Sequence, residues 1–433
     1  MWERYGFFGI ENFSNNKKEK YVMKENMFTR KRKMEFKDYI NVILGNRGKT
    51  LSIELFDYLN IKNGGYMEDI TKQAFSKQRQ YIDPQLFKDL NYEVINGFIT
   101  NAETNLKTWN GYYILACDGV KMEVPHHKTT YKEFNLDWKA SKNNKPSRVL
   151  VSCIADCLNE FVWDTEVEEA ETSEEKLIYN HISNLEKNYQ TEKYILIMDR
   201  GYPSLTLLKH LDEKNIKYLI RLPKSYYKEE IKSMKTDDEY VKIEITDNRI
   251  NNLNPKSQEQ LKNTKEINAR ITKNTVKNNE LVTITNLTKE ELKKEEIIEL
   301  YHLRWKIETA YDRLKNKQHV ENFSGRTKIA ILQDLYAGIF LYNYIICIKK
   351  DLEEEKNITI DLNKQINMNL LIGQIKFSFY QRILTDDKNF ALQKHKEIYE
   401  FLVKRLLPKS KDETNPRKKG PQNKYKTNNR KNF

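Results

Sequence analysis

The chain has 433 residues, enough for two or three domains and a sizeable hydrophobic core, so a small protein held together by disulfides is excluded. Hydrophobic residues make up 39% and charged residues 32% of the chain, which is typical of a globular protein and not of a collagen-like or wholly disordered one. The formal net charge of +13 predicts binding to polyanions that weakens as salt is added.

The apolar segments and the cysteines indicate the cellular compartment of the protein. The longest apolar stretch, Leu335–Ile348, is shorter than the roughly 18 residues that a membrane-spanning helix needs. The first residues lack the apolar core of a secretory signal, so we expect a cytoplasmic (nucleoid-associated) protein with no membrane partner. The four cysteines lie in apolar runs without metal-ligand spacing and are expected to be reduced core residues.

Helical spacing of apolar residues dominates the region that follows a polar, basic N-terminal arm. Phe36, Tyr39, Ile40 and Ile43 recur at intervals of three and four residues, and the pattern continues to about residue 97. The stretch 70–79 predicts a further helix with a basic outer face, similar to the last helix of a helix-turn-helix. Its candidate DNA-binding residues are Lys72, Lys77 and Arg79, although a merely solvated basic face fits the pattern as well.

From residue 111 the pattern changes to short apolar runs that are typical of buried strands. Strands are expected at 113–117, 148–157 and 160–163, then a helix at 174–185, a strand at 194–198, a helix at 203–213 and a strand at 216–221. Three strands followed by helix, strand, helix and strand is the order of a ribonuclease-H-like α/β domain with a mixed sheet. We therefore predict an α/β fold of that type.

The remaining segments complete the predicted domain organisation. The stretch 224–288 is β-rich and interrupts the core, which resumes with helices at 290–318 and 327–350. The tail carries nine Lys or Arg residues against two acids, together with several Pro, so it is expected to be disordered. The predicted parts are an arm (1–35), a small all-α DNA-binding domain (36–105), the core (106–223 and 289–350), its β-rich insertion (224–288), a C-terminal helical region (351–407) and the basic tail (408–433).

Two aspartates follow apolar strands of this predicted core. Asp118 and Asp199 each come directly after a run of at least four apolar residues. An acid in that place is either a turn residue or a group held at the C-terminal end of a buried strand, close to its neighbours. Since the predicted fold makes the two strands neighbours, both carboxylates are expected to face one crevice, where divalent cations would stabilise them.

Four polar residues share one side of the predicted helix 290–318. At 100° per residue, Tyr301, Arg304, Glu308 and Lys315 lie within a sector of about 60°, which borders the apolar stripe of the helix. A carboxylate on that border can point into a cleft while the other side of the helix packs on the sheet. The alternative is a surface Arg–Glu pair at i and i+4, with little energetic weight.

The spacing Tyr301-x2-Arg304-x3-Glu308-x6-Lys315 resembles the signature of the insertion-sequence-four family of bacterial DDE transposases. Asp118-Gly119 and Asp199-Arg200-Gly201-Tyr202 match further motifs of that family in the same order. One departure is Val120, where the family usually has a small hydroxyl residue. The resemblance covers about residues 36–350 and implies a ribonuclease-H-like catalytic core.

This resemblance also implies a mechanism and a set of roles. Asp118, Asp199 and Glu308 would be the catalytic acids and would hold two Mg²⁺ ions, which Mn²⁺ can replace, for strand cleavage and transfer. Arg304, Lys315 and Tyr301 would contact DNA phosphates, with Arg200 as a further candidate. Trp305 would either stack on an unpaired base or pack in the core. The partners would be double-stranded DNA, as transposon ends and target, and a second copy of the chain in the DNA complex.

Two other interpretations of the sequence remain. A catalytically decayed or domesticated relative would bind DNA without cutting it. A ribonuclease-H-type nuclease would use the same metal ions but would not need the helical DNA-binding region. Intact acids at all three positions argue against the decayed relative.

Overall fold

The computed structural model describes residues 16–30, 32–65, 70–100, 106–136, 147–189, 193–276, 279–354, 363–384 and 388–409. The expected disorder of the basic tail concerns residues that lie almost wholly outside these ranges. In the described part, all four cysteines are buried free thiols, as predicted.

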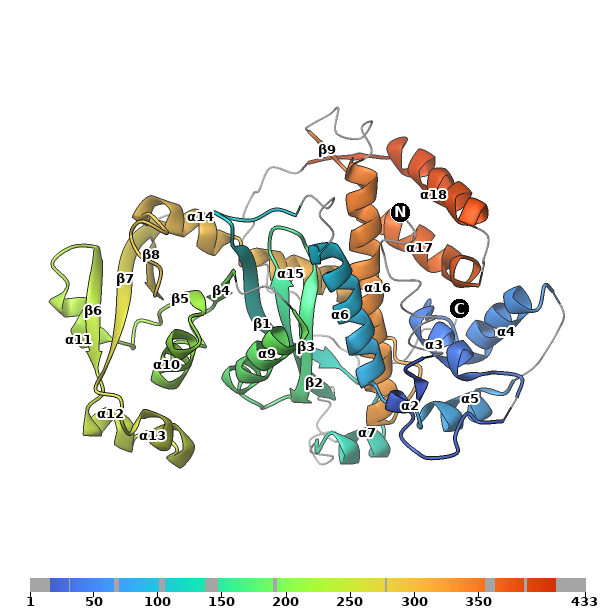
Figure 1. Ribbon diagram of the computed structural model, residues 1–433, viewed down its shortest axis with the longest axis horizontal. Coiled ribbons are helices and arrows are strands. Elements are labelled where there is room, and N and C mark those ends of the chain that lie inside the picture. The colour runs from blue at the N-terminus through green and yellow to red at the C-terminus, as the bar shows by residue number, and fades with distance from the viewer. Residues whose placement is uncertain are drawn as a thin grey trace.

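A mixed eight-stranded sheet forms the centre of the molecule, in the order β3-β2-β1-β4-β5-β8-β7-β6 (Figure 1). Strands β1 (Tyr113–Glu123), β4 (Tyr194–Met198) and β5 (Lys217–Arg221) run parallel to one another. Strands β2 (Arg148–Asp156) and β3 (Val162–Glu169) complete the first half by antiparallel pairing. This arrangement is the mixed sheet of a ribonuclease-H-like α/β core, so the predicted fold class is confirmed.

Strand β1 extends further than the sequence pattern indicated. Its first half, Ile114 to Cys117, is fully buried and is paired with β2 on one edge and β4 on the other. Its second half continues to Glu123 against β2 alone, with Lys121 exposed and Met122 buried. Asp118 therefore lies in the middle of β1 and not at its C-terminal end, which corrects the expected placement.

The region predicted to be a β-rich insertion extends the same sheet. Strands β6 (Asp238–Glu244), β7 (Glu266–Val276) and β8 (Asn279–Thr285) form an antiparallel meander, and β8 pairs with β5 of the core. Three short helices accompany these strands, namely α11 (Lys228–Ser233), α12 (Asp247–Asn251) and α13 (Pro255–Leu261). The edge strand β6 lies at the opposite end of the molecule from the N-terminal and C-terminal helices (Figure 1).

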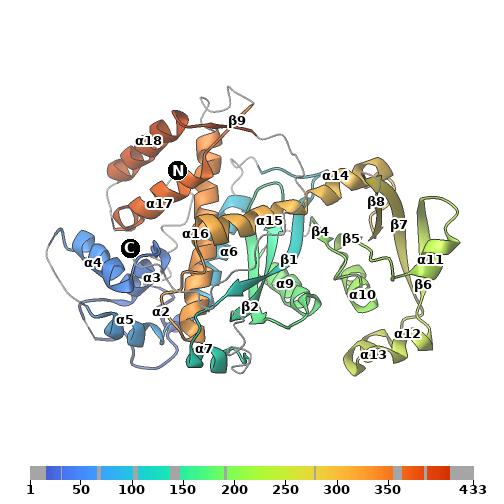
Figure 2. The same cartoon turned by 180° about the vertical axis from the view of Figure 1, so that it is seen from behind.

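Several helices pack on the sheet. Helix α9 (Glu174–Asn188) contacts β1, β2 and β3, while α10 (Leu205–Glu213) contacts β5. The single helix predicted for 290–318 is divided into α14 (Ile297–His302), α15 (Trp305–Asp312) and a wider turn at Arg313–Lys317. Helix α15 crosses β1 and β2, as Figure 2 shows from behind.

Helix α16 (Lys328–Glu354) runs through the molecule beside α6 (Gln85–Thr100). By length and composition its segment Lys328–Glu353 could cross a membrane, but 89% of its most apolar window is buried inside the protein. Buried polar contacts fix it there, because Asn343 on α16 bonds Asn91 on α6 and both the carbonyl and the amide of Val162 on β3. Helix α16 is therefore the central core helix of this fold.

The helical N-terminal region consists of α2 (Lys18–Tyr21), α3 (Phe36–Leu44), α4 (Leu51–Lys62) and α5 (Lys72–Arg79). The described part of the expected arm packs on it, since Tyr21 is buried and Val22 bridges to Ile82. Helices α17 (Met368–Ile383) and α18 (Lys388–Val403) form the C-terminal region, with α17 packed against α4 and α16. Short elements complete the fold: α7 (Lys128–Glu133), a 3₁₀ turn at Lys294–Glu296, and the strand pair β9 (Lys364–Gln365) and β10 (Leu407–Pro408).

Candidate active site

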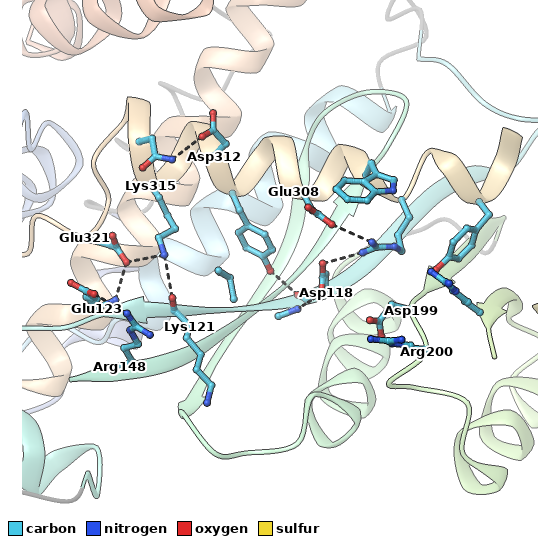
Figure 3. Close-up of a pocket in the computed structure, with 18 residues that line it drawn as sticks. Asp118, Lys121, Glu123, Arg148, Asp199, Arg200, Glu308, Asp312, Lys315 and Glu321 are labelled. Carbon is cyan, nitrogen blue, oxygen red and sulfur yellow. Dashed lines mark hydrogen bonds and ion pairs between the residues drawn. The ribbon is translucent and has the colours of Figure 1, made fainter. Parts of the chain in front are cut away.

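A cavity of about 880 Å³ lies where α15 crosses β1 (Figure 3). Eight of the eleven residues proposed from the sequence line it, from three separate stretches of the chain: Asp118, Asp199, Arg200, Tyr301, Arg304, Trp305, Glu308 and Lys315. Folding thus brings together residues that are up to 197 positions apart in the sequence. Lys72, Lys77 and Arg79 do not belong to this cavity.

The register of two parallel strands places the aspartates side by side. Strand β1 pairs with β4 up to Cys117, which lies opposite Met198, so Asp118 and Asp199 are the residues that directly follow this last pair on the two strands. Each carboxylate accepts a hydrogen bond from a nearby backbone amide: Asp118 from Gly119 at 2.9 Å, and Asp199 from Gly201 at 2.7 Å. These local bonds fix how the two carboxylates enter the cavity.

Arg304 joins the first and third acids. One of its terminal nitrogens, Nη1, lies 3.1 Å from Asp118 Oδ2, and the other, Nη2, lies 3.2 Å from Glu308 Oε1. Arg304 is only 9% exposed, and no described residue accepts a hydrogen bond from its buried Nε. Leu303 and Arg304 are held by i to i+3 hydrogen bonds between α14 and α15, and this local tightening turns Arg304 into the cavity.

The electrostatics of the cavity reflect three neighbouring acids. Burial raises the pKa of the Asp118 carboxyl above its ordinary value, and Asp199 and Glu308 raise it further, whereas Arg304 and the Gly119 amide oppose the rise. A fourth acid, Glu174 at the start of α9, also has a raised pKa because of its burial and the charge of Asp118. Sequence reasoning missed Glu174, because its position is that of an ordinary acid in the first turn of a helix.

Glu174 occupies space that Gly119 leaves free. A Cβ atom on Gly119 would lie 2.7 Å from the carboxyl carbon of Glu174, and the buried Tyr202 hydroxyl donates to Glu174 Oε2 at 3.2 Å. The glycine of the Asp118-Gly119 pair therefore permits a close approach of α9 to β1. A side chain directly after the first acid would require the carboxyl group of Glu174 to move away.

Carboxylate oxygens are the donors that Mg²⁺ and Mn²⁺ prefer, so Asp118, Asp199 and Glu308 fit such cations by their chemistry. In the described ranges, however, no three His, Cys, Asp or Glu side chains already lie close enough together to hold a metal ion. Two of the three acids are instead drawn to the guanidinium of Arg304.

The remaining cavity residues differ in exposure. Tyr301 is 8% exposed, whereas Trp305 is 48% exposed, so core packing of Trp305 is excluded. Lys315 Nζ is bound to Glu321 Oε1 at 3.2 Å and to the carbonyl of Lys121 at 3.1 Å. Sequence reasoning missed several lining residues that belong to no motif, one at the end of α15 and the others on strands and loops: Asp312, and Lys121, Glu123, Arg148, Arg221 and Glu321.

The proposed role of Arg79 in DNA binding is wrong. Arg79 is 1% exposed, and its guanidinium contacts Asp334 at 2.8 Å, Gln333 at 2.7 Å and Ser324 at 2.6 Å at the start of α16. It therefore anchors α5 to the core and is not available to a ligand. Lys72 and Lys77 on the same helix are exposed, as the sequence predicted.

A second cavity, of about 920 Å³, lies in the helical N-terminal region. Its basic residues are Lys18, Arg30, Arg32 and Lys37, against the single carboxylate of Glu35. Gln78 of α5 also lines it, so this basic cavity adjoins the exposed lysines of that helix. The sequence showed the basic run around Arg30 but not that it surrounds a cavity.

A buried chain of hydrogen bonds connects β3, α9 and β2 and ends at the backbone of β1. Asp164 binds His181 Nδ1 at 2.7 Å, and His181 Nε2 lies 2.9 Å from Ser152 Oγ. All three residues are at most 1% exposed, so this Ser–His–Asp set cannot meet a substrate. Ser152 Oγ instead lies 3.5 Å from the carbonyl oxygen of Asp118, which makes the set part of the support of the first acid.

A ribonuclease-H-like sheet with neighbouring aspartates and a facing glutamate beside basic groups defines the class of metal-assisted phosphoryl-transfer enzymes that act on nucleic acids. Residues 109–344, more than half of the chain, match the family model described as "Transposase DDE domain". The chain therefore belongs to the DDE transposase family. No curated protein matches the sequence.

The chain is also similar to a piggyBac transposase, solved by cryo-electron microscopy as a synaptic complex with hairpin DNA. The sequence identity is 12%, the match covers 91% of this chain and 85% of the other, and the TM-score is 0.42.

Proposed function

We propose that this protein is the transposase of a bacterial insertion sequence of the insertion-sequence-four type. In this proposal it binds the terminal inverted repeats of its element, cuts the DNA there and joins the freed 3′ ends to target DNA. The observation that carries the proposal is the convergence of Asp118, Asp199 and Glu308 on one cavity with Arg304 between them.

In the proposed mechanism, Asp118, Asp199 and Glu308 hold two Mg²⁺ ions, and Mn²⁺ can replace them. Bound there, such ions would activate a water or a DNA 3′-hydroxyl and would stabilise the oxygen that leaves the phosphorus. Arg304, Lys315 and Arg200 orient the phosphates of the DNA. The Nε of Arg304 donates no hydrogen bond to any described residue, so it is a donor for such a phosphate. Trp305, exposed at the cavity mouth, stacks on a base.

The catalytic part of the proposal is tested with a plasmid that carries the DNA segments flanking the gene. Wild-type protein should nick this plasmid in the presence of Mg²⁺ or Mn²⁺, and Asp199→Asn should not. The variant should still shift the same DNA in a gel. If wild type and Asp199→Asn nick equally, or neither nicks while both bind, the enzyme proposal is wrong and a DNA-binding relative without activity is favoured.

The DNA-binding part rests on the basic cavity and on the exposed Lys72 and Lys77 of α5. Replacing Arg30 and Arg32 together by Ala should weaken DNA binding and lower the slope of log K against log salt by about 0.9 for each phosphate that is no longer neutralised. Lys242→Ala with Lys262→Ala is the matched control, because it removes two exposed charges from the opposite end of the molecule. Equal effects of both double variants would contradict a defined binding surface.

Two copies of the chain are proposed to assemble on a pair of transposon ends. Light scattering of the protein with end DNA should then give a complex with two chains and two duplexes. A complex with one chain, under conditions where the DNA is cut, would contradict this assembly.

A further inference from the structure

The guanidinium of Arg304 holds the same oxygen atoms that a cation would need. Its two terminal nitrogens contact Asp118 Oδ2 and Glu308 Oε1, which belong to different elements of the fold, β1 and α15. These three side chains are largely removed from water, because that of Arg304 is 11% exposed and those of Asp118 and Glu308 are 20% and 24% exposed. Arg304 thus neutralises part of the acidic cluster when no cation is bound.

This arrangement leaves Arg304 incompletely satisfied. Its Nε is buried and no described residue accepts a hydrogen bond from it. A buried donor without an acceptor costs on the order of 1–3 kcal/mol, so a new acceptor that reached the whole guanidinium fork would be favoured. A phosphate offers such an acceptor, because its oxygens match the planar fork of an arginine.

The charge of the cavity wall also favours a phosphate only after cations have bound. Six acidic and six basic side chains line the cavity, so its formal charge is zero without cations. A phosphate that enters this neutral cavity gains little attraction from it. Cations bound to the acids would give the cavity a net positive charge and free the guanidinium at the same time.

We propose that Arg304 competes with divalent cations for Asp118 and Glu308, and that cation binding transfers its guanidinium to a DNA phosphate. The inference rests on the proposed function for the identity of the cation site. Because coupling between two ligands is reciprocal, DNA that engages Arg304 also strengthens cation binding. The protein without DNA therefore binds cations weakly, and the active site is completed only when both are present.

The test is the affinity of the DNA-free protein for Mn²⁺, measured by titration calorimetry. Arg304→Ala should bind Mn²⁺ about tenfold more tightly than wild type, because the competitor for two ligands is gone. Arg148→Ala is the charge-matched control, since it removes one positive charge from the same wall, where Arg148 pairs with Glu123 and not with the three acids, and it should change the affinity by no more than about twofold. Circular dichroism establishes that each variant is folded.

A second measurement does not depend on any variant of Arg304 being stable. A short random-sequence duplex should tighten Mn²⁺ binding to wild-type protein by several-fold after correction for binding to the DNA itself. Arg304→Lys, which keeps the charge but lacks the planar fork, should reduce this gain.

The outcomes separate the inference from the proposed function. If wild type binds Mn²⁺ and folded Arg304→Ala binds it equally or more weakly, the guanidinium organises the acids, and the competition is refuted while the metal site stands. If neither wild type nor Arg304→Ala binds Mn²⁺, both the competition and the metal part of the proposed function are refuted.

Discussion

The hydroxyl of Tyr311 donates a hydrogen bond of 2.6 Å to the backbone carbonyl of Asp118. Tyr311 lies one helical turn after Glu308 on α15, so this bond ties the helix of the third acid to the strand of the first acid. The residue is 6% exposed, and its hydroxyl also lies 3.4 Å from the carbonyl of Val151 on β2. The distance between Asp118 and Glu308 therefore depends on a contact that neither side chain makes.

Replacing Tyr311 by Phe should slow DNA cleavage while leaving DNA affinity nearly unchanged. The loss of one hydroxyl frees α15 to shift on β1, and a displacement of about 1 Å can cost up to about 100-fold in rate. The free energy of unfolding should fall by only about 1 kcal/mol. Single-turnover cleavage at saturating DNA and Mg²⁺ measures the effect.

Tyr342→Phe is the control for this experiment. Tyr342 is also a buried tyrosine that donates to a backbone carbonyl, that of Glu160 at 3.0 Å, but it lies on α16 away from the cavity. The free energy of unfolding of Tyr342→Phe should fall by a similar amount, but this variant should cleave DNA as fast as wild type. Equal loss of cleavage in both variants would show that Tyr311 acts only through general stability.

Arg79→Ala should destabilise the whole protein and not only its DNA binding. The substitution leaves the side chain of Asp334, 2% exposed, without its cation, and breaking one partner of a buried pair costs about 3–5 kcal/mol. Urea denaturation measures the change. Lys77→Ala, on the same helix but exposed, should stay within about 0.5 kcal/mol of wild type, and a similar stability of both variants would contradict the anchoring role.

The contrast between Arg79 and Asp118 shows which features local sequence can predict. The strand before Asp118 was predictable because a strand buried on both faces of a sheet has a continuous apolar run. The burial of Arg79 was not predictable, since its partner Asp334 is 255 residues away and only tertiary packing brings them together.

The candidate site shows the same division. Spacing on one helix predicted that Arg304 and Glu308 share a face, and the structure places both in the cavity despite the break between α14 and α15. Spacing could not predict that Arg304 also reaches Asp118, or that Glu174 fills the space beside Gly119. Such contacts depend on the register of β1 and on the position of α9, which leave no local pattern in the sequence.

Gly45→Ala should weaken the docking of α17 on the helical N-terminal region. A Cβ at position 45 would lie 2.0 Å from the ring of Tyr380, a rigid and fully buried side chain, so α17 must move. Overpacking of this kind costs about 1–3 kcal/mol. Gly373→Ala, within α17 and with no described atom within 4 Å of the new Cβ, should instead stabilise the protein by up to about 1 kcal/mol. Thermal unfolding distinguishes the two, and the same sign for both changes would contradict this packing.

Glu160 should stabilise the protein in a manner that depends on pH. Its carboxylate binds Arg313, directly after α15, and Lys349 on α16, and these cations lower its pKa to about 2 against the opposing effect of burial. Because the pKa is lower in the folded protein than in the unfolded chain, where it is about 4.3, the stabilisation is fully present above that value and is lost as the pH falls towards 2. Glu160→Gln should therefore cost on the order of 2–3 kcal/mol at neutral pH, and the difference from wild type should shrink as the pH is lowered from about 5 towards 2. Urea denaturation of both proteins across this range measures it; a difference that stays constant with pH would mean that the contacts of Glu160 act through shape and not through charge.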